Sequence, residues 1–422
     1  MADVEWEEWE VIERLLPAGW EAKAKETGTL RRCRGFPDAS RLLRVLMIHL
    51  VDGCSLRETA VRAAEGELAK VSDVALLKVL RRCQEWFRWM GQGLMQRWLT
   101  QLEPCGTEKR IRAVDGSMIS EPGSTGSNWR LHYSATLPSL HCDEVIVTGP
   151  EVGESFMRFK VQPGDVLIGD RGLAHRQGIR HVLDGGADVI VRLNLTNVPL
   201  MDHRGQRFGL LHHLRRLRGT KVGDWPVVVA DDQGQVKGRV CAIKKSRSAT
   251  ARARQRTQQE NSKKGHVVRD STLEAAGYIF VFTTLMAAQY PAETVLELYR
   301  CRWQVELAFK RLKSILATGH LKKTDPIGAQ AWLQGKLLAA LIIEALINTG
   351  ERFSPWGYPL FDSSRCLWRD TSLMRFVLSG AANPKLGLRA CLRRWGSISH
   401  NLREPTRRRP LQMALLSASD LC

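Results

Sequence analysis

The sequence predicts an α/β protein in which a mixed sheet lies between helical regions at the two ends of the chain. Two observations predict this class. The first hundred residues carry apolar side chains at helical spacing, and short apolar runs bounded by glycine and proline begin near residue 108. Helical spacing returns after residue 290. A chain of 422 residues is long enough for these regions to form several structural units around a sizeable core.

Composition limits the class of protein. Lysine and arginine number 63 against 44 acidic residues, which gives a net charge of +19 and favours a polyanionic partner such as nucleic acid. Residues 1–13 are acidic and lack the pattern of a signal peptide. The longest apolar stretch, residues 337–347, contains Glu344 and is too short to cross a bilayer. The ten cysteines form no Cys-x-x-Cys pair, which indicates a reducing cytoplasm, so neither a secreted nor a membrane protein is expected.

The N-terminal region, residues 1–107, is expected to be helical. Helices are expected over residues 36–51, 56–64 and 74–89. Ser55 and Glu58 form a capping-box pattern before the second of them, and Ser72 precedes the third. Short basic helices suit either contact with nucleic acid or a helical cap packed on the next unit, and the sequence leaves both alternatives open.

Residues 108–195 are expected to form the first part of the sheet. Strands are expected over residues 111–115, 129–137, 144–147, 165–168 and 187–195. Asp115 ends the first of these runs and is followed by Gly-Ser, whereas Asp170 lies in a Gly-Asp-Arg-Gly turn after the fourth. Functional side chains gather where strands end beside a turn. A single aspartate of this kind is also a common turn cap, so the argument depends on the pair.

Residues 196–275 are irregular and basic, and they are expected to form a β-rich insertion. Residues 225–230 and 235–243 have the pattern of a hairpin. Residues 244–264 hold eight basic residues against one glutamate and almost no large apolar side chain. This composition predicts a solvated, mobile segment that a polyanion would order.

Residues 276–350 are expected to complete the sheet unit, and residues 351–422 to form a helical, basic C-terminal region. A strand is expected over residues 278–283, with helices over residues 293–316 and 333–348. The tail, residues 385–409, carries eight basic residues against Glu404.

The helix expected at 293–316 carries one dense polar stripe. At about 100° per residue, four side chains lie within about 40° of Glu306, namely Tyr299, Arg302, Lys310 and Lys313. A ladder of surface ion pairs is the simplest explanation. An apolar stripe on the neighbouring side, formed by Leu298, Val305, Phe309 and Leu312, indicates instead a helix that is buried along one face.

Asp115, Asp170 and Glu306 are therefore candidates for one acidic site. Three converging carboxylates repel one another unless a cation neutralises them, and oxygen ligands suit Mg²⁺ or Mn²⁺ rather than zinc. Two such ions, about 3.5–4 Å apart, support phosphoryl transfer. An acidic metal site in a strongly basic chain points to cutting or joining of a nucleic-acid backbone.

This arrangement resembles the bacterial insertion-sequence transposases of the DDE type, in the group named after insertion sequence four. Their signature of Tyr, two residues, Arg, three residues, Glu, six residues and Lys is met by Tyr299, Arg302, Glu306 and Lys313. The resemblance covers roughly residues 108–320. It implies a ribonuclease-H-like core with a β-rich insertion between the second and third acidic residues.

The resemblance also implies roles for individual residues. Asp115, Asp170 and Glu306 would be the catalytic residues and would bind two Mg²⁺ or Mn²⁺ ions. The resemblance implies DNA contacts for Tyr299, Arg302 and Lys313, and Lys310 and Arg171 are further expected DNA contacts. Some relatives stack a tryptophan on a base flipped out of the transposon end, and here Tyr278 lies near the corresponding place.

The function expected from these features is cut-and-paste transposition of double-stranded DNA. The enzyme would act as a homodimer. It would cleave at the transposon ends, form a hairpin intermediate on the DNA, and join the freed ends to target DNA. Two alternatives remain: a ribonuclease-H-like DNA nuclease that cuts without joining, and a catalytically decayed DNA-binding protein.

Overall fold

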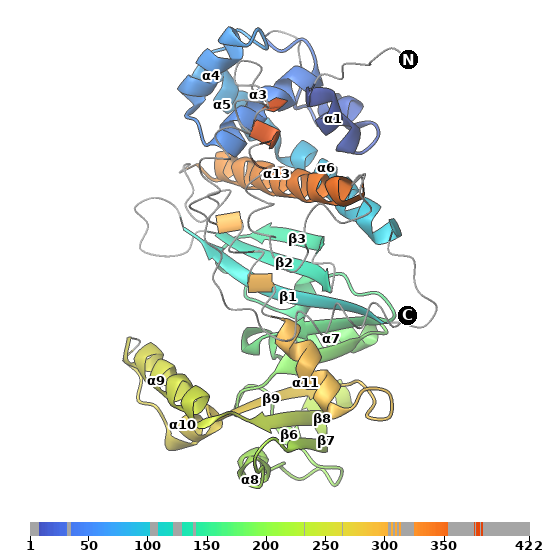
Figure 1. The fold of residues 1–422 in the computed structure, drawn as a ribbon, viewed down its shortest axis with the longest axis vertical. Coiled ribbons are helices and arrows are strands. Elements are labelled where there is room, and N and C mark those ends of the chain that lie inside the picture. Colours follow the sequence, from blue (N-terminus) through green and yellow to red (C-terminus); the bar gives the residue numbers. More distant parts are fainter. Residues whose placement is uncertain are drawn as a thin grey trace.

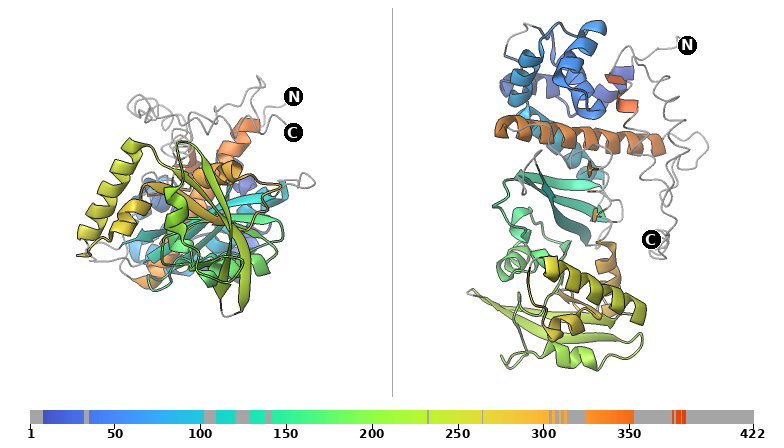
Figure 2. Two further views of the ribbon diagram at one scale, coloured as in Figure 1. Left: turned by 90° about the horizontal axis from the view of Figure 1, so that it is seen from below. Right: turned by 90° about the vertical axis from the view of Figure 1, so that its left-hand side faces the viewer.

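The computed structural model describes residues 8–31, 35–101, 109–120, 129–137, 141–231, 233–263, 265–302, 305, 306, 309, 312, 313, 325–352, 375, 377–379, 381 and 382. The predicted C-terminal region therefore lies almost wholly outside the described residues, and so does Lys310. Figures 1 and 2 show an elongated molecule, with the N-terminal helices at one end and the strands of the insertion at the other.

Within the described residues, nine strands form one continuous sheet in the order β3-β2-β1-β4-β5-β9-β8-β7-β6. The strands are β1 (Arg110–Ile119), β2 (Trp129–Leu137), β3 (Cys142–Thr148), β4 (Asp165–Gly169), β5 (Asp188–Arg192), β6 (Leu200–Met201), β7 (Val222–Asp231), β8 (Gly234–Lys244) and β9 (Tyr278–Thr283). The strands β1, β2 and β3 form an antiparallel meander, and β4 and β5 run parallel to β1. This half of the sheet has the strand arrangement expected of a ribonuclease-H-like core.

The insertion extends this sheet instead of forming a separate layer. The strand β9 pairs antiparallel with β5 on one side and with β8 on the other, so the hairpin of β7 and β8 joins the core edge through β9. The predicted hairpin is confirmed, with Gly234 as the first residue of β8 and a backbone φ of 134°. The insertion and the core thus share hydrogen-bonded strands.

The helices lie on both faces and at the N-terminal end. They are α1 (Glu8–Leu15), α2 (Trp20–Glu26), α3 (Ala39–Asp52), α4 (Leu56–Glu65), α5 (Asp73–Arg82), α6 (Gln84–Gln101), α7 (Arg176–Asp184), α8 (Leu210–Arg215), α9 (Arg247–Lys263), α10 (Asp270–Ala275), α11 (Ala292–Cys301) and α13 (Pro326–Arg352). Ser55 caps α4 by accepting from the Glu58 amide at 3.1 Å, and Ser72 caps α5 by accepting from Ala75 at 3.2 Å. Both predicted caps are confirmed.

Two predicted helices are interrupted in the structure. The helix expected over 74–89 ends at Arg82 and resumes as α6, because Cys83 is fully buried and its amide bonds to Leu80 in a tight last turn. The helix expected over 293–316 is likewise broken, since α11 ends at Cys301 and Arg302 forms its cap. Residues 305, 306, 309, 312 and 313 are helical again.

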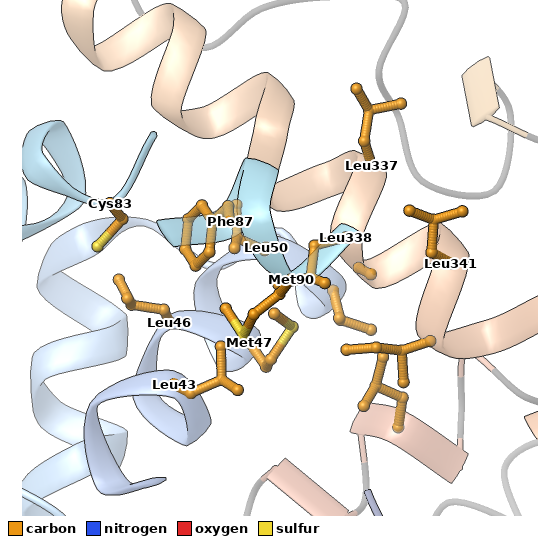
Figure 3. Close-up of a cluster of buried hydrophobic side chains, with 14 of the residues drawn as sticks. Leu43, Leu46, Met47, Leu50, Cys83, Phe87, Met90, Leu337, Leu338 and Leu341 are labelled. Atoms are coloured by element: carbon orange, nitrogen blue, oxygen red, sulfur yellow. The ribbon is translucent and has the colours of Figure 1, made fainter. Parts of the chain in front are cut away.

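The largest core lies between α3, α6 and α13, as Figure 3 shows. Its labelled apolar side chains are Leu43, Leu46, Met47, Leu50, Phe87, Met90, Leu337, Leu338 and Leu341. Each such burial contributes roughly 1.5–3 kcal/mol. The same cluster continues onto the face of β1, β2 and β3, so the N-terminal helices share one core with the sheet.

The helix α13 is longer than the sequence predicts. Its segment Pro326–Leu346 is long and apolar enough to cross a membrane by length and composition, but 72% of that window is buried inside the protein. It contacts α6, α5 and α3. The segment is therefore packed as a core helix.

The basic segment predicted to be mobile is mostly an α-helix. Residues 247–263 form α9, which stands beyond the edge of the sheet together with α10 (Figures 1 and 2). Mobility is predicted from the high positive charge of this stretch. The stretch also lacks glycine and proline and is rich in alanine, arginine and glutamine, which favour an α-helix.

Candidate active site

Asp170 lies where the sequence predicts it, directly after the buried strand β4. Its Oδ1 accepts a hydrogen bond of 2.6 Å from the Arg171 amide, at the start of a short 3₁₀ turn. This turn begins because β5, the neighbour of β4, pairs only as far as Gly169. Asp170 is half-buried, and its carboxylate is fixed by the turn that follows the strand.

Asp115 lies within a strand, so its predicted place at a strand end is wrong. The strand β1 continues to Ile119 because β2 pairs with it along the whole length, with Asp115 opposite Tyr133. Its parallel pairing with β4 does stop earlier, at Ala113 opposite Ile168.

The register brings the two aspartates together. Asp115 and Asp170 each lie two positions beyond the pair formed by Ala113 and Ile168. Adjacent strands lie about 4.8 Å apart, so the two residues reach the same level of the sheet on neighbouring strands.

Arg302 connects the aspartates to Glu306. It donates from Nη1 to Asp115 Oδ2 at 3.3 Å and from Nη2 to Glu306 Oε1 at 2.8 Å. Burial lowers the pKa of Arg302. The neighbouring Tyr299, Asp170, Glu306 and Asp115 raise it by more than burial lowers it, so the net shift of this pKa is upward. The break between α11 and the next helical residues places this arginine at the centre of the acidic group.

Arg302 thus contacts two of the three acidic residues, Asp115 and Glu306, and interacts electrostatically with Asp170. No three acidic, histidine or cysteine side chains of the described residues lie close enough together to hold a metal ion directly, because the Arg302 guanidinium stands between Asp115 and Glu306. The donors are all carboxylate oxygens, which suit Mg²⁺ or Mn²⁺. The three acids therefore suit a divalent ion by the chemistry of their donors, whereas in this structure Asp115 and Glu306 are bridged by the Arg302 guanidinium.

Electrostatics at Asp115 support the same conclusion. Burial raises the pKa of Asp115 to about 6, Glu154 and Asp170 raise it as well, and the Gly116 amide and Arg302 oppose the shift. A buried carboxylate among like charges favours a cation as its neighbour.

Glu154 is an acidic neighbour that the sequence did not single out. A Cβ built on Gly116 would lie 2.6 Å from Glu154 Oε1, and one on Gly172 would lie 2.5 Å from its Oε2. The carboxylate therefore rests against the backbone next to Asp115 and near Asp170. Glu154 also lines a polar pocket of about 430 Å³ together with Arg158 and Arg176. It follows a Gly-rich loop with no apolar run before it, so no strand-end pattern marks it.

Basic side chains form a second group beside Asp170. The pKa of Lys245 is lowered to about 8 by burial and then by Arg192 and Arg171, and its Nζ donates to the Ala276 carbonyl at 2.8 Å. Arg171 and Lys313 were expected to contact DNA, and both are exposed. Arg192, at the end of β5, and Lys245, after β8, were not singled out, because only the order of strands in the sheet makes them neighbours.

The two tyrosines of the prediction lie in different surroundings. Tyr299 packs against β4 and β5, and its buried hydroxyl has no hydrogen-bond partner among the described residues. The Arg302 guanidinium lies 6.0 Å from the centre of its ring. Tyr278, at the start of β9, is 7% exposed within the core of the insertion. Its ring is covered by packing, which does not favour the expected stacking on a base.

A different acidic cluster is structural. Arg112 is 2% exposed and pairs with Asp143 at 2.6 Å, Glu144 at 3.0 Å and Asp165 at 3.1 Å. These carboxylates are neutralised by a buried arginine, and the cluster lies at the start of β4, at the opposite end of that strand from Asp170.

Comparison with known proteins identifies the family. Residues 153–342 match the family described as Transposase DDE domain. The chain is 36% identical over 346 residues to InsL, the transposase assigned to insertion sequence element IS186A of Escherichia coli strain K12, which covers 80% of this chain and 93% of that protein. It is 35% identical over 347 residues to the transposase of element IS421 of Escherichia coli, with the same coverage.

A solved structure has a similar fold. The cryo-EM structure of the piggyBac transposase synaptic complex with hairpin DNA matches with a TM-score of 0.50 and 8% identity, covering 97% of this chain and 85% of that one. This likeness concerns the fold and supports the ribonuclease-H-like core. The family match and the identity to the two Escherichia coli proteins show that the chain belongs to the DDE transposases of insertion sequences.

Proposed function

We propose that this transposase excises its element by cut-and-paste, with Asp115, Asp170 and Glu306 as the catalytic acids. The observation that carries the proposal is the contact of one guanidinium, that of Arg302, with Asp115 and Glu306 beside Asp170. Three acids from distant parts of the sequence meet around one positive charge. Bound by them, two Mg²⁺ or Mn²⁺ ions would supply charge neutralisation and activation of the attacking oxygen in phosphoryl transfer.

The chain's own residues hold the DNA and align it. Arg302 and the buried Tyr299 hydroxyl face the acidic group, where a phosphate of the transposon end offers acceptors to both. Exposed Arg171, next to Asp170, adds positive charge there, and exposed Lys313 of the signature and Lys310 of the same predicted stripe are assigned phosphate contacts too. Alignment and fixed charge of this kind supply most of the catalysis in phosphoryl transfer.

The proposed reaction is a series of four displacements. Hydrolysis of a phosphodiester at the transposon end frees a 3′ hydroxyl. That hydroxyl then attacks a phosphodiester of the opposite strand, which forms a hairpin and releases the flanking DNA. Water next opens the hairpin and frees the 3′ hydroxyl again, and this hydroxyl attacks a phosphodiester of target DNA. Each attack forms one P–O bond and breaks another. Because both ends of the element must react together, we propose a homodimer on DNA, acting in the cytoplasm on the nucleoid.

Strand transfer is tested with the full chain, Mg²⁺, a labelled duplex carrying the element's end and a supercoiled plasmid. The proposal expects label joined covalently to the plasmid. A product that is cut but never joined would favour a nuclease, and a duplex that is bound but never cut would favour a decayed DNA-binding protein.

A further inference from the structure

The helix α9 has no core of its own. None of its 17 residues is buried. The helix contains five arginine and lysine residues but only one acidic residue, Glu260. Arg252 and Arg256 are four residues apart and repel each other on a free helix. Figures 1 and 2 show α9 standing beyond the sheet with only α10 and nearby loops beside it. Packing therefore does not explain why this cationic helix is presented to solvent.

One side of α9 is docked on the insertion. Arg254 donates from Nε to the Leu273 carbonyl at 3.1 Å, and Thr250 lies beside Gly277. The half-buried residues of the helix are Ala249, Thr250, Ala253, Thr257 and Asn261. Counted at about 100° per residue from Arg247, they occupy the sector between about 200° and 320°. This docked side fixes which side of α9 faces outward.

The outward side has a neutral centre and two cationic edges. Gln255 and Gln259 lie at about 80° and 120°, opposite the docked side, and both are exposed. One edge, at about 140–180°, carries Arg252, Arg256 and Lys263. The other edge, at about 0°, carries Arg247, while Arg254, at about 340°, is held by the Leu273 carbonyl at the border of the docked side.

We propose that α9 enters the major groove of duplex DNA, with Gln255 and Gln259 on base edges and the two cationic edges on the phosphates that flank the groove. The major groove of B-DNA admits an α-helix, and glutamine can make a bidentate contact with adenine there. Phosphate contacts fix position, whereas base contacts give sequence preference. Seventeen residues span about 25 Å, enough to cross the groove. The inference rests on the proposed DNA substrate and adds the part of the chain that reads its sequence.

Other polyanionic partners fit α9 less well. Binding of single strands depends on aromatic stacking, and α9 contains no aromatic residue. The major groove of double-stranded RNA is too narrow for side chains to read. A helix that lies on a membrane surface needs a large apolar face, which α9 lacks. Duplex DNA is the partner that matches both the side-chain amides of Gln255 and Gln259 and the cationic edges on either side of them.

The test measures binding of the full chain to two duplexes, the element's own end and a scrambled duplex of equal composition, at several salt concentrations. Replacing both glutamines (Q255A with Q259A) should reduce the ratio of the two affinities by about tenfold or more while the salt dependence stays unchanged. A matched control replaces two exposed glutamines outside α9, Gln206 and Gln289, by alanine and should leave the ratio unchanged.

The cationic edge is tested separately. Replacing Arg252, Arg256 and Lys263 by alanine should weaken binding to both duplexes alike and reduce the slope of log K against log salt by roughly 2 to 3. Alanine preserves helix, and circular dichroism checks that each variant is folded.

The outcomes separate this inference from the proposed function. If the wild type prefers its own end and joins it to a plasmid, yet the glutamine variant keeps the full preference, the inference about α9 is overturned and the function stands. If 7-deazaadenine in the end weakens binding of the wild type but not of the glutamine variant, the major-groove contact is supported. A wild type that does not distinguish the two duplexes contradicts base reading by any helix.

Discussion

The Arg302 guanidinium donates a hydrogen bond of 3.3 Å to the carboxylate of Asp115, although 187 residues separate the two in sequence. The same group reaches Glu306, four residues further along the chain, at 2.8 Å. One arginine at a helix break therefore joins the middle of a central strand to the helical residues that follow α11.

The three acids are each expected to be necessary for cleavage but not for binding. Asp115→Asn, Asp170→Asn and Glu306→Gln remove one charge each without changing size. Loss of a group worth several kcal/mol to the transition state should slow end cleavage by at least about a hundredfold. Cleavage of a labelled transposon end measures the rate, and a gel shift checks that binding persists. Wild-type rates in any one variant would remove that residue from the site.

Lys313 is expected to contact a phosphate near the cut. Its side chain is exposed, seven residues after Glu306 in the sequence, and its replacement by alanine should reduce the slope of log K against log salt by about 1. The control is Lys25→Ala, which removes an equally exposed charge from α2. Equal slopes in the wild type and Lys313→Ala would argue against the contact.

Glu154 is expected to strengthen cation binding at the site. It adds negative charge beside Asp115, and supporting carboxylates of this kind typically change metal affinity by about 10- to 100-fold. Calorimetric titration with Mn²⁺ in the presence of end DNA should show weaker binding for Glu154→Gln than for the wild type. Glu151→Gln, in the same loop and exposed, should bind as the wild type does. If the two variants bind Mn²⁺ equally well, Glu154 has no such role.

DNA affinity is expected to fall as the pH rises through about 8. The pKa of Lys245 is lowered to about 8 because the side chain is buried and faces Arg192 of β5 and Arg171 after β4. A phosphate binds the charged form, which predominates below this pKa, and only about a tenth of the side chains remain charged at pH 9. Affinity measured by anisotropy should fall by up to about tenfold between pH 7 and pH 9. Lys245→Arg stays charged over this range, so an equally steep fall in that variant would exclude Lys245 as the cause.

The buried pairs of Arg112 are expected to hold the core sheet together. Arg112→Leu leaves Asp143, Glu144 and Asp165 without their common partner, which should lower the free energy of unfolding by about 3–5 kcal/mol. Urea denaturation measures the change. Arg215→Leu, which breaks an exposed pair with Glu274, should have a much smaller effect. Similar changes in both variants would contradict the structural role of Arg112.

The sequence by itself determined the features that depend on local pattern. The strands at residues 129–137 and 278–283 are found at the predicted bounds, and both serine caps are confirmed, because periodicity and capping act between residues close in the chain. The resemblance to insertion-sequence transposases rests on the spacing of Tyr299, Arg302, Glu306 and Lys313, and the comparisons show the family. The functional assignment of the individual residues stays a prediction.

Only the tertiary structure decided what depends on neighbours distant in sequence. Asp115 lies inside β1 because β2 extends the strand past it. The order of strands brings Lys245 near Arg192 and Arg171, and the loop after β3 places Glu154 against Gly116 and Gly172. The side of α9 that faces outward is set by contacts with Leu273 and Gly277, which no helical periodicity encodes. Strand length, helix breaks and exposed faces are set by hydrogen bonding and packing between segments, and a linear pattern specifies only the side chains that each segment can offer.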